Sequence, residues 1–211
     1  MINIFICPIN GRSRVGKNTF VDEFGKLVES GHYTVDHCMV AHISAVKYLK
    51  EAMPLLINEE YSGEFAQRTF LYNLLKLVNS YKSISKILLE KIHKICTNRI
   101  IAKATTKIFF VDMRDPYDIN ELKDRVNECI STEFIDGEYV NFIFKTIIIE
   151  NKNDTNENLD DWDKKIFDID YDYRIDNSGT IEDLKSEAFL LLKDFMEMRP
   201  LISFRSDFDG E

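Results

Sequence analysis

The segment from Gly11 to Thr19 contains the residues whose types and spacing most directly indicate chemistry. Its first seven residues, GRSRVGK, match the G-x-x-x-x-G-K (Walker A) pattern of a phosphate-binding loop. Glycines allow the backbone to curl so that successive amide N–H groups point inward, and the N-terminus of a following helix adds partial positive charge. We therefore expect a nucleotide phosphate chain to be bound by Gly11, Arg12, Ser13, Arg14, Val15, Gly16, Lys17, Asn18 and Thr19.

The elements expected on either side of the loop are those that the pattern requires. The apolar run Ile2–Cys7 predicts a buried central strand, which Pro8, Asn10 and Gly11 are expected to stop. From Lys17 onward, apolar residues recur at helical spacing, which predicts an amphipathic helix that ends near Gly31. The alternative, a simple turn beside an exposed lysine, does not explain this order of strand, loop and helix.

Lys17 is the expected catalytic cation of the loop. Its ammonium group would reach the β- and γ-phosphates and neutralise the charge that moves toward the leaving ADP oxygen. The next residue is Asn18, and Thr19 follows it, so the hydroxyl that usually serves magnesium is displaced by one position. In this respect the loop resembles those of adenylate kinases and phage deoxynucleoside monophosphate kinases. The resemblance implies that Thr19 contacts phosphate or a water molecule on magnesium.

Strands and helices are expected to alternate along the rest of the chain. This order predicts one three-layer α/β/α domain over residues 1–211, with a mostly parallel five-stranded sheet and a helical insertion at 41–105 between strands 2 and 3. Further strands are expected at 33–40, 107–112, 142–149 and 171–175, and helices at 45–53, 65–78, 84–97, from Pro116 and from Thr180 to Met196, before a frayed tail at 200–211.

Asp112 and Arg114 are the main candidates outside the loop. Asp112 ends the apolar run KIFFVD, and Arg114 follows two residues later, so both should emerge at the carboxyl edge of the sheet beside the phosphate loop. A carboxylate at this edge orients magnesium or its waters, and an arginine grips an acceptor phosphate through its planar guanidinium. A surface ion pair at the end of a strand is the alternative interpretation.

Two further segments extend the resemblance to deoxynucleoside monophosphate kinases. VDMRDPYDINELK resembles the segment that follows the third strand in that family, and IDNSGTIEDL resembles the start of its last helix. The resemblance implies that the helical insertion binds the acceptor and that Lys47 and Arg68 meet its phosphate. It also places Asn177, Gly179 and Thr180 near the adenine, although a turn and a helix cap explain these residues equally well.

One departure from the family concerns the loop after the fourth strand. Family members often carry an arginine there, whereas this chain has Glu150 and Lys152. Arg12 and Arg14 are therefore expected to stabilise more of the transition-state charge.

The composition limits the classes of partner. A formal charge of -9 indicates a surface that repels nucleic acid and anionic lipid, so we expect small-molecule nucleotide substrates, with ATP and Mg2+, and neither nucleic acid nor membrane as partner. No apolar run approaches the length of a membrane span, and we expect a cytoplasmic protein. The group His37, Cys38 and His42 lacks metal-ligand spacing and is interpreted as structural. The oligomeric state stays open, a homodimer included.

Three other functions compete with a nucleoside monophosphate kinase. NKND at 151–154 matches the guanine-reading N-K-x-D of GTP-binding switch proteins, but no D-x-x-G follows a strand at the required place. An inactive P-loop module that only binds nucleotide is a second alternative. Kinases of other small phosphorylated molecules, such as phosphomevalonate or dephospho-coenzyme A, have the same scaffold.

Overall fold

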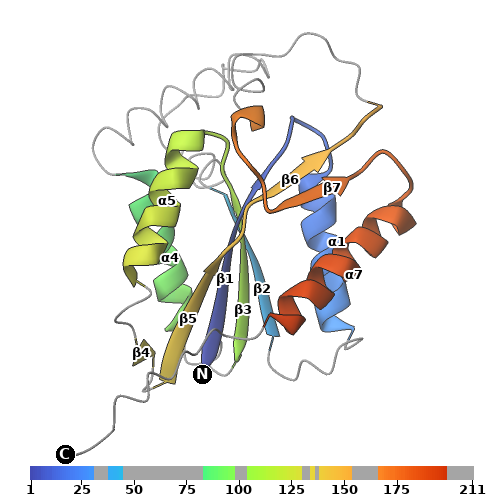
Figure 1. Ribbon diagram of the computed structural model, residues 1–211. Coiled ribbons are helices and arrows are strands. Elements are labelled where there is room, and N and C mark those ends of the chain that lie inside the picture. Colours follow the sequence, from blue (N-terminus) through green and yellow to red (C-terminus); the bar gives the residue numbers. More distant parts are fainter. Residues whose placement is uncertain are drawn as a thin grey trace, which may run out of the picture.

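A central sheet with helices on both faces forms the molecule (Figure 1). The computed structural model describes residues 1–30, 38–44, 83–97, 104–129, 134–135, 138–153 and 166–198. Within these residues the sheet has seven strands, and every pairing is parallel except that between β4 and β5. The strands are β1 (Ile2–Asn10), β2 (Cys38–Ser44), β3 (Thr106–Asp112), β4 (Phe134–Ile135), β5 (Glu138–Phe144), β6 (Ile147–Glu150) and β7 (Tyr173–Asp176).

Strand β1 lies at the centre of this sheet. It pairs with β3 on one side and with β5 and β6 on the other, while β2 lies beyond β3 and β7 beyond β6. Residues 4–10 of β1 are all buried, because helices cover both faces of the strand. This explains why β1 is almost entirely apolar rather than alternating.

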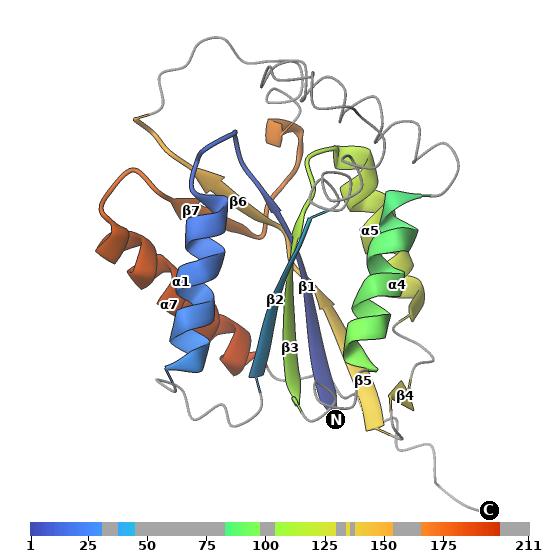
Figure 2. The ribbon, with the colours of Figure 1, turned by 180° about the vertical axis from the view of Figure 1, so that it is seen from behind.

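Two helical layers cover the two faces (Figure 2). Helices α1 (Lys17–Glu29) and α7 (Ile181–Glu197) pack on one face, where Phe5, Phe24 and Phe195 contribute to the core. Helices α4 (Ile84–Cys96) and α5 (Pro116–Cys129) pack on the other, with Leu88 and Leu122 against the sheet. The apolar faces of α1 and α4, recognised from their helical spacing, are the faces that the structure buries.

Most of the predicted elements are confirmed, and so is the three-layer α/β/α class. The expected five-stranded sheet is wrong, because the described residues form seven strands: β4 was not expected, and the strand expected at 142–149 is divided into β5 and β6. Thr180 caps α7 in a capping box with Asp183, and the Asp115 side chain accepts from the Tyr117 N–H at the start of α5. Lys47, Arg68, the helices expected at 45–53 and 65–78 and the tail at 200–211 lie outside the described residues.

Two predicted boundaries are wrong. Residues 41–44, expected to begin the helical insertion, belong to β2, because this strand pairs with β3 along its whole length and buries Ile43. The single strand expected at 142–149 begins earlier and is interrupted between Phe144 and Ile147. At the interruption the Thr146 N–H donates to the Asp172 carboxylate (2.8 Å) instead of to the sheet, a tertiary contact that no local pattern signals.

Candidate phosphate-binding site

The candidate site lies at the carboxyl ends of the parallel strands, where β1, β3, β6 and β7 end (Figure 1). The phosphate loop follows β1, Asp112 ends β3, and Asn177 follows β7. In parallel α/β sheets, ligands bind at this edge because the strand-to-helix loops converge there. The expected positions of the loop, Asp112 and Arg114 at one edge are thus those in the structure.

The phosphate loop adopts a backbone that its glycines make feasible. Gly11, Arg14 and Gly16 have positive φ angles of 135°, 64° and 93°. A Cβ atom on Gly11 would lie 2.4 Å from the Ile149 carbonyl oxygen, and one on Gly16 would lie 2.3 Å from the Asn177 Nδ2 atom. Both glycines of the motif are therefore required by backbone conformation and by space.

Lys17 points back over this loop. Its Nζ atom donates hydrogen bonds to the Gly11 and Arg12 carbonyl oxygens, at 2.7 and 2.8 Å. The same residue begins α1, whose N-cap, Gly16, has no side chain to cap the first turn. An ammonium group and a helix N-terminus therefore converge on the loop, an arrangement suited to a polyanion.

Asn177, which follows β7, connects the phosphate loop to β6. Its Nδ2 atom donates to the Val15 carbonyl oxygen (2.8 Å), and its backbone N–H donates to the Glu150 carbonyl oxygen (2.7 Å). Asn177 thus lies beside the phosphate loop, whereas its expected place near the adenine stays a prediction. Gly179 and Thr180 instead form the start of α7, where a Cβ atom on Gly179 would lie 2.4 Å from the Asp183 carboxylate.

Asn10, the last residue of β1, connects the phosphate loop to the segment that follows β3. This buried residue accepts the Gly11 N–H at its Oδ1 atom (2.9 Å), and its Nδ2 atom lies 3.5 Å from the Arg114 carbonyl oxygen. Burial raises the pKa of the neighbouring Tyr171 hydroxyl to about 12, although the Asn10 side chain opposes this shift. The hydroxyl therefore stays protonated at neutral pH and donates to the Ile166 carbonyl oxygen (2.8 Å).

Arg114 follows β3 and has an exposed side chain. Arg12 lies over the ring of Phe167, with 5.6 Å between Cζ and the ring centroid. Phe167 belongs to a short 3-10 helix at Ile166–Asp168, which the sequence patterns did not predict. This cation-π contact joins the phosphate loop to the segment that precedes β7.

Asp112 carries a buried oxygen atom that lacks a donor. Among the described residues, no hydrogen bond reaches its Oδ1 atom, and the His42 Nε2 atom lies 3.3 Å away without hydrogen-bond geometry. A buried, unsatisfied carboxylate oxygen is costly unless a ligand completes it, and hard cations or their waters prefer such oxygens. Asp112 therefore fits the role of orienting Mg2+ or its waters.

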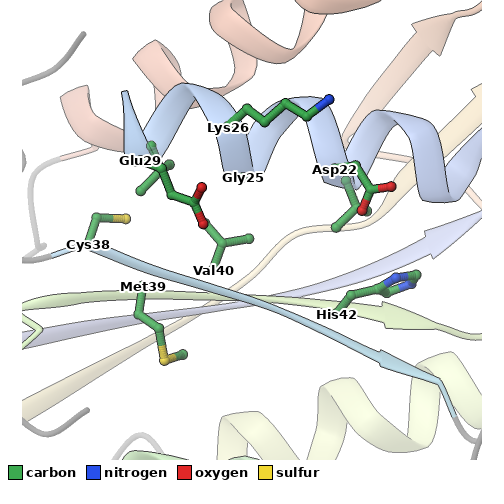
Figure 3. Close-up of a pocket in the computed structure, with 10 residues that line it drawn as sticks. Asp22, Gly25, Lys26, Glu29, Cys38, Met39, Val40 and His42 are labelled. Carbon is green, nitrogen blue, oxygen red and sulfur yellow. The ribbon is translucent and has the colours of Figure 1, made fainter. Parts of the chain in front are cut away.

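His42 and Asn10 are the residues at this edge that sequence reasoning did not assign to the site. His42 lies two residues before the end of β2 and reaches Asp112 only because β2 pairs with β3 in parallel register. Residues of α1 and β2, among them His42, Asp22 and Val40, line a groove of about 550 Å³. Figure 3 shows His42 at one end of this row of residues. No local signal marked it, because its approach to Asp112 depends on the pairing of β2 with β3.

The NKND segment lies in the loop that follows β6. Lys152 pairs with Asp176 (Nζ to Oδ2, 2.6 Å), and Asn153 donates to the Ser178 carbonyl oxygen (2.8 Å). Asp154 lies outside the described residues. These two side chains thus connect the loop after β6 to the loop after β7.

No protein-family model and no curated protein matches the sequence. Solved structures similar to the chain include a cysteine-to-alanine mutant of the APS kinase CysC from Mycobacterium tuberculosis (15% identity, TM-score 0.41, 92% of this chain and 99% of that one). They also include thymidylate kinase from Ehrlichia chaffeensis (14%, TM-score 0.47, 92% and 100%) and APE1195 (16%, TM-score 0.45, 93% and 97%). In the described part of the chain, no helix is both long and apolar enough to cross a membrane.

Proposed function

We propose that the chain is an ATP-dependent phosphotransferase that moves the γ-phosphate to a small phosphorylated acceptor, most directly a nucleoside or deoxynucleoside monophosphate. The observation that carries the proposal is the loop from Gly11 to Lys17. Its ammonium group, its two sterically required glycines and the uncapped start of α1 meet at one edge of the sheet. This combination suits the phosphate chain of a nucleoside triphosphate.

On the donor side, Lys17 would exchange its bonds to the Gly11 and Arg12 carbonyls for bonds to the β- and γ-phosphates. An oxygen of the acceptor phosphate attacks the γ-phosphorus, and the bond from that phosphorus to the bridging oxygen breaks to release ADP. Lys17, with Arg12 and Arg14, stabilises the charge that accumulates during this step.

Asp112 and Thr19 are the residues that would hold Mg2+, which supplies charge neutralisation and alignment of the phosphates when bound. Thr19 lies in the first turn of α1 with an exposed side chain, and the buried Oδ1 atom of Asp112 has no donor among the described residues. Magnesium in such sites is bound by few protein oxygens together with substrate phosphates.

On the acceptor side, Arg114 would grip the phosphate of the monophosphate. Lys47 and Arg68 complete this part of the proposal through the family resemblance alone. Because a phosphate oxygen is already a nucleophile, the transfer needs no strong general base, and positioning with charge stabilisation supplies most of the rate.

The experiment is ADP release measured across ribo- and deoxynucleoside monophosphates, phosphomevalonate and dephospho-coenzyme A, with ATP or GTP as donor and a control without acceptor. We expect ADP release to rise well above this control with at least one monophosphate. Release with another acceptor would retain phosphotransfer but change the substrate class. A strong preference for GTP, without stimulation by any acceptor, would favour the switch protein. ATP binding without any turnover would favour the inactive module.

A further inference from the structure

Asn177 contacts the phosphate loop in two ways, whereas the sequence resemblance had placed it near the adenine. Its side-chain amide donates to the Val15 carbonyl oxygen at 2.8 Å, across 162 positions of sequence. The same nitrogen lies 2.3 Å from where a Cβ atom of Gly16 would be, so it occupies the space that the glycine leaves. The carboxamide is thus packed against the peptide unit that joins Val15 to Gly16.

The backbone around Asn177 is held in place. Its N–H donates to the Glu150 carbonyl oxygen (2.7 Å), and the next N–H, that of Ser178, donates to Asp176 Oδ1 (3.0 Å). The Ser178 hydroxyl in turn accepts the Lys152 N–H at 2.7 Å. A side chain on so constrained a turn loses little further entropy when it holds a partner.

The contact determines the direction of a loop amide. In a planar trans peptide the C=O and the following N–H point in opposite directions. Because Asn177 holds the Val15 carbonyl on its own side, the Gly16 N–H must point away from Asn177. Gly16 at φ 93° has access to several peptide orientations, so an external contact is needed to select one.

We propose that Asn177 is a positioning residue for the phosphate loop, which aims the Gly16 N–H at the bound phosphates and acts independently of the nucleotide base. The inference rests on the proposed phosphate-binding function of the loop. It replaces the expectation that Asn177 serves the adenine. We therefore expect inorganic tripolyphosphate, a ligand with no base, to bind more weakly when the Asn177 amide is removed.

The test measures the affinities of the full chain for ATP, GTP and magnesium tripolyphosphate by calorimetry, in the wild type, Asn177→Ala and Asn177→Asp. We expect Asn177→Ala to lower the affinity for all three ligands by the same factor, about tenfold, because one hydrogen bond that orders the loop is lost. Asn177→Asp keeps the shape of the side chain and should weaken them more. Its carboxylate faces the Val15 carbonyl and adds negative charge near the phosphates.

Asn141→Ala is the matched control. It removes another partly buried amide hydrogen bond, from Asn141 Nδ2 to Asn3 Oδ1 (3.1 Å), near the opposite end of β1. We expect it to lower the melting temperature without changing the affinity for tripolyphosphate, which separates positioning from a general loss of stability. All affinities are measured at a temperature at which circular dichroism shows each variant to be folded.

Two results would overturn the inference. A variant that loses affinity for ATP but keeps that for tripolyphosphate within about twofold would make Asn177 a reader of the base. Unchanged affinity for every ligand in both variants would leave it without a role in the loop. A wild type that binds tripolyphosphate but phosphorylates no acceptor would refute the proposed transferase and leave this inference standing. A wild type that does not bind tripolyphosphate would refute both.

Discussion

The phosphate loop and the acceptor edge, by which we mean Asp112 and Arg114, lie side by side at the ends of β1 and β3. The protein nevertheless holds them differently. The loop is held by a contact from a distant segment, Asn177 to the Val15 carbonyl oxygen, and by the adjacent Asn10, which accepts the Gly11 N–H. At the acceptor edge the buried Asp112 Oδ1 atom has no donor among the described residues, and the Arg114 side chain is exposed.

This contrast indicates that the phosphate loop is organised before substrate arrives. Pre-formed hydrogen bonds orient the loop amides, so little reorganisation is needed when phosphate binds. The buried carboxylate oxygen of Asp112, in contrast, is completed by a ligand under the proposed function. We therefore expect substitutions in the loop to impair every nucleotide reaction, and substitution of Arg114 to discriminate between acceptors.

Lys17→Ala should have the largest effect, because it removes the cation of the phosphate loop. The variant loses the cation on the phosphates and also the two bonds to the Gly11 and Arg12 carbonyls. We expect ADP formation to fall by about a hundredfold to a thousandfold, in a coupled assay with the best acceptor. Lys26→Ala removes a surface lysine of the same helix that pairs with Glu23, and should retain activity. Equal activity of Lys17→Ala and the wild type would refute the proposed mechanism.

Arg114→Ala should have an intermediate effect that falls on one side of the comparison. We expect kcat/KM for the acceptor to fall about tenfold to a hundredfold, since a charge-assisted contact is lost, while the affinity for ATP stays within about twofold. Arg125→Ala, which removes a half-buried arginine paired with Glu121 on α5, is the control. A loss of ATP affinity as large as the loss in kcat/KM would contradict the separation between the phosphate loop and the acceptor edge.

Asp172→Ala should have the smallest effect and leave both the phosphate loop and the acceptor edge unchanged. Burial opposes ionisation of this carboxyl, but hydrogen bonds from Thr146 and the Lys145 ammonium outweigh it and hold its pKa below the usual range. Because the folded-state pKa is lowered, its stabilisation is present above the unfolded pKa of about 3.9 and is lost as the pH falls through the folded value.

Urea unfolding of the wild type and Asp172→Ala measures this contribution. At pH 7 we expect the variant to be less stable by about 1 kcal/mol, a value reduced for the solvent exposure of the carboxylate, and the difference to shrink as the pH falls below about 4. ATP affinity should not change. A difference in stability that grows toward acid would show that the sign of the pKa shift is wrong.

The resemblance and the local patterns together anticipated more of the donor side than of the acceptor side. The pattern GRSRVGK predicts the loop, since its glycines, its lysine and the flanking apolar periods are adjacent in sequence, and the structure has these elements where expected. The approach of His42 to Asp112 depends on the parallel pairing of β2 with β3. A single residue in a strand carries no local sign of its neighbour across the sheet.

Local patterns in the chain sufficed to predict β1, the phosphate loop, α1 and the capping box of α7, because hydrophobic periodicity, glycine spacing and capping all act within a few residues. Three contacts could be seen only in the folded protein: Asn177 with Val15, Asn10 with Arg114, and Asp172 with Thr146, where the strand after Phe144 is interrupted. Each of these contacts joins residues 26 to 162 positions apart, and packing of the sheet, not local preference, brings them within hydrogen-bond distance.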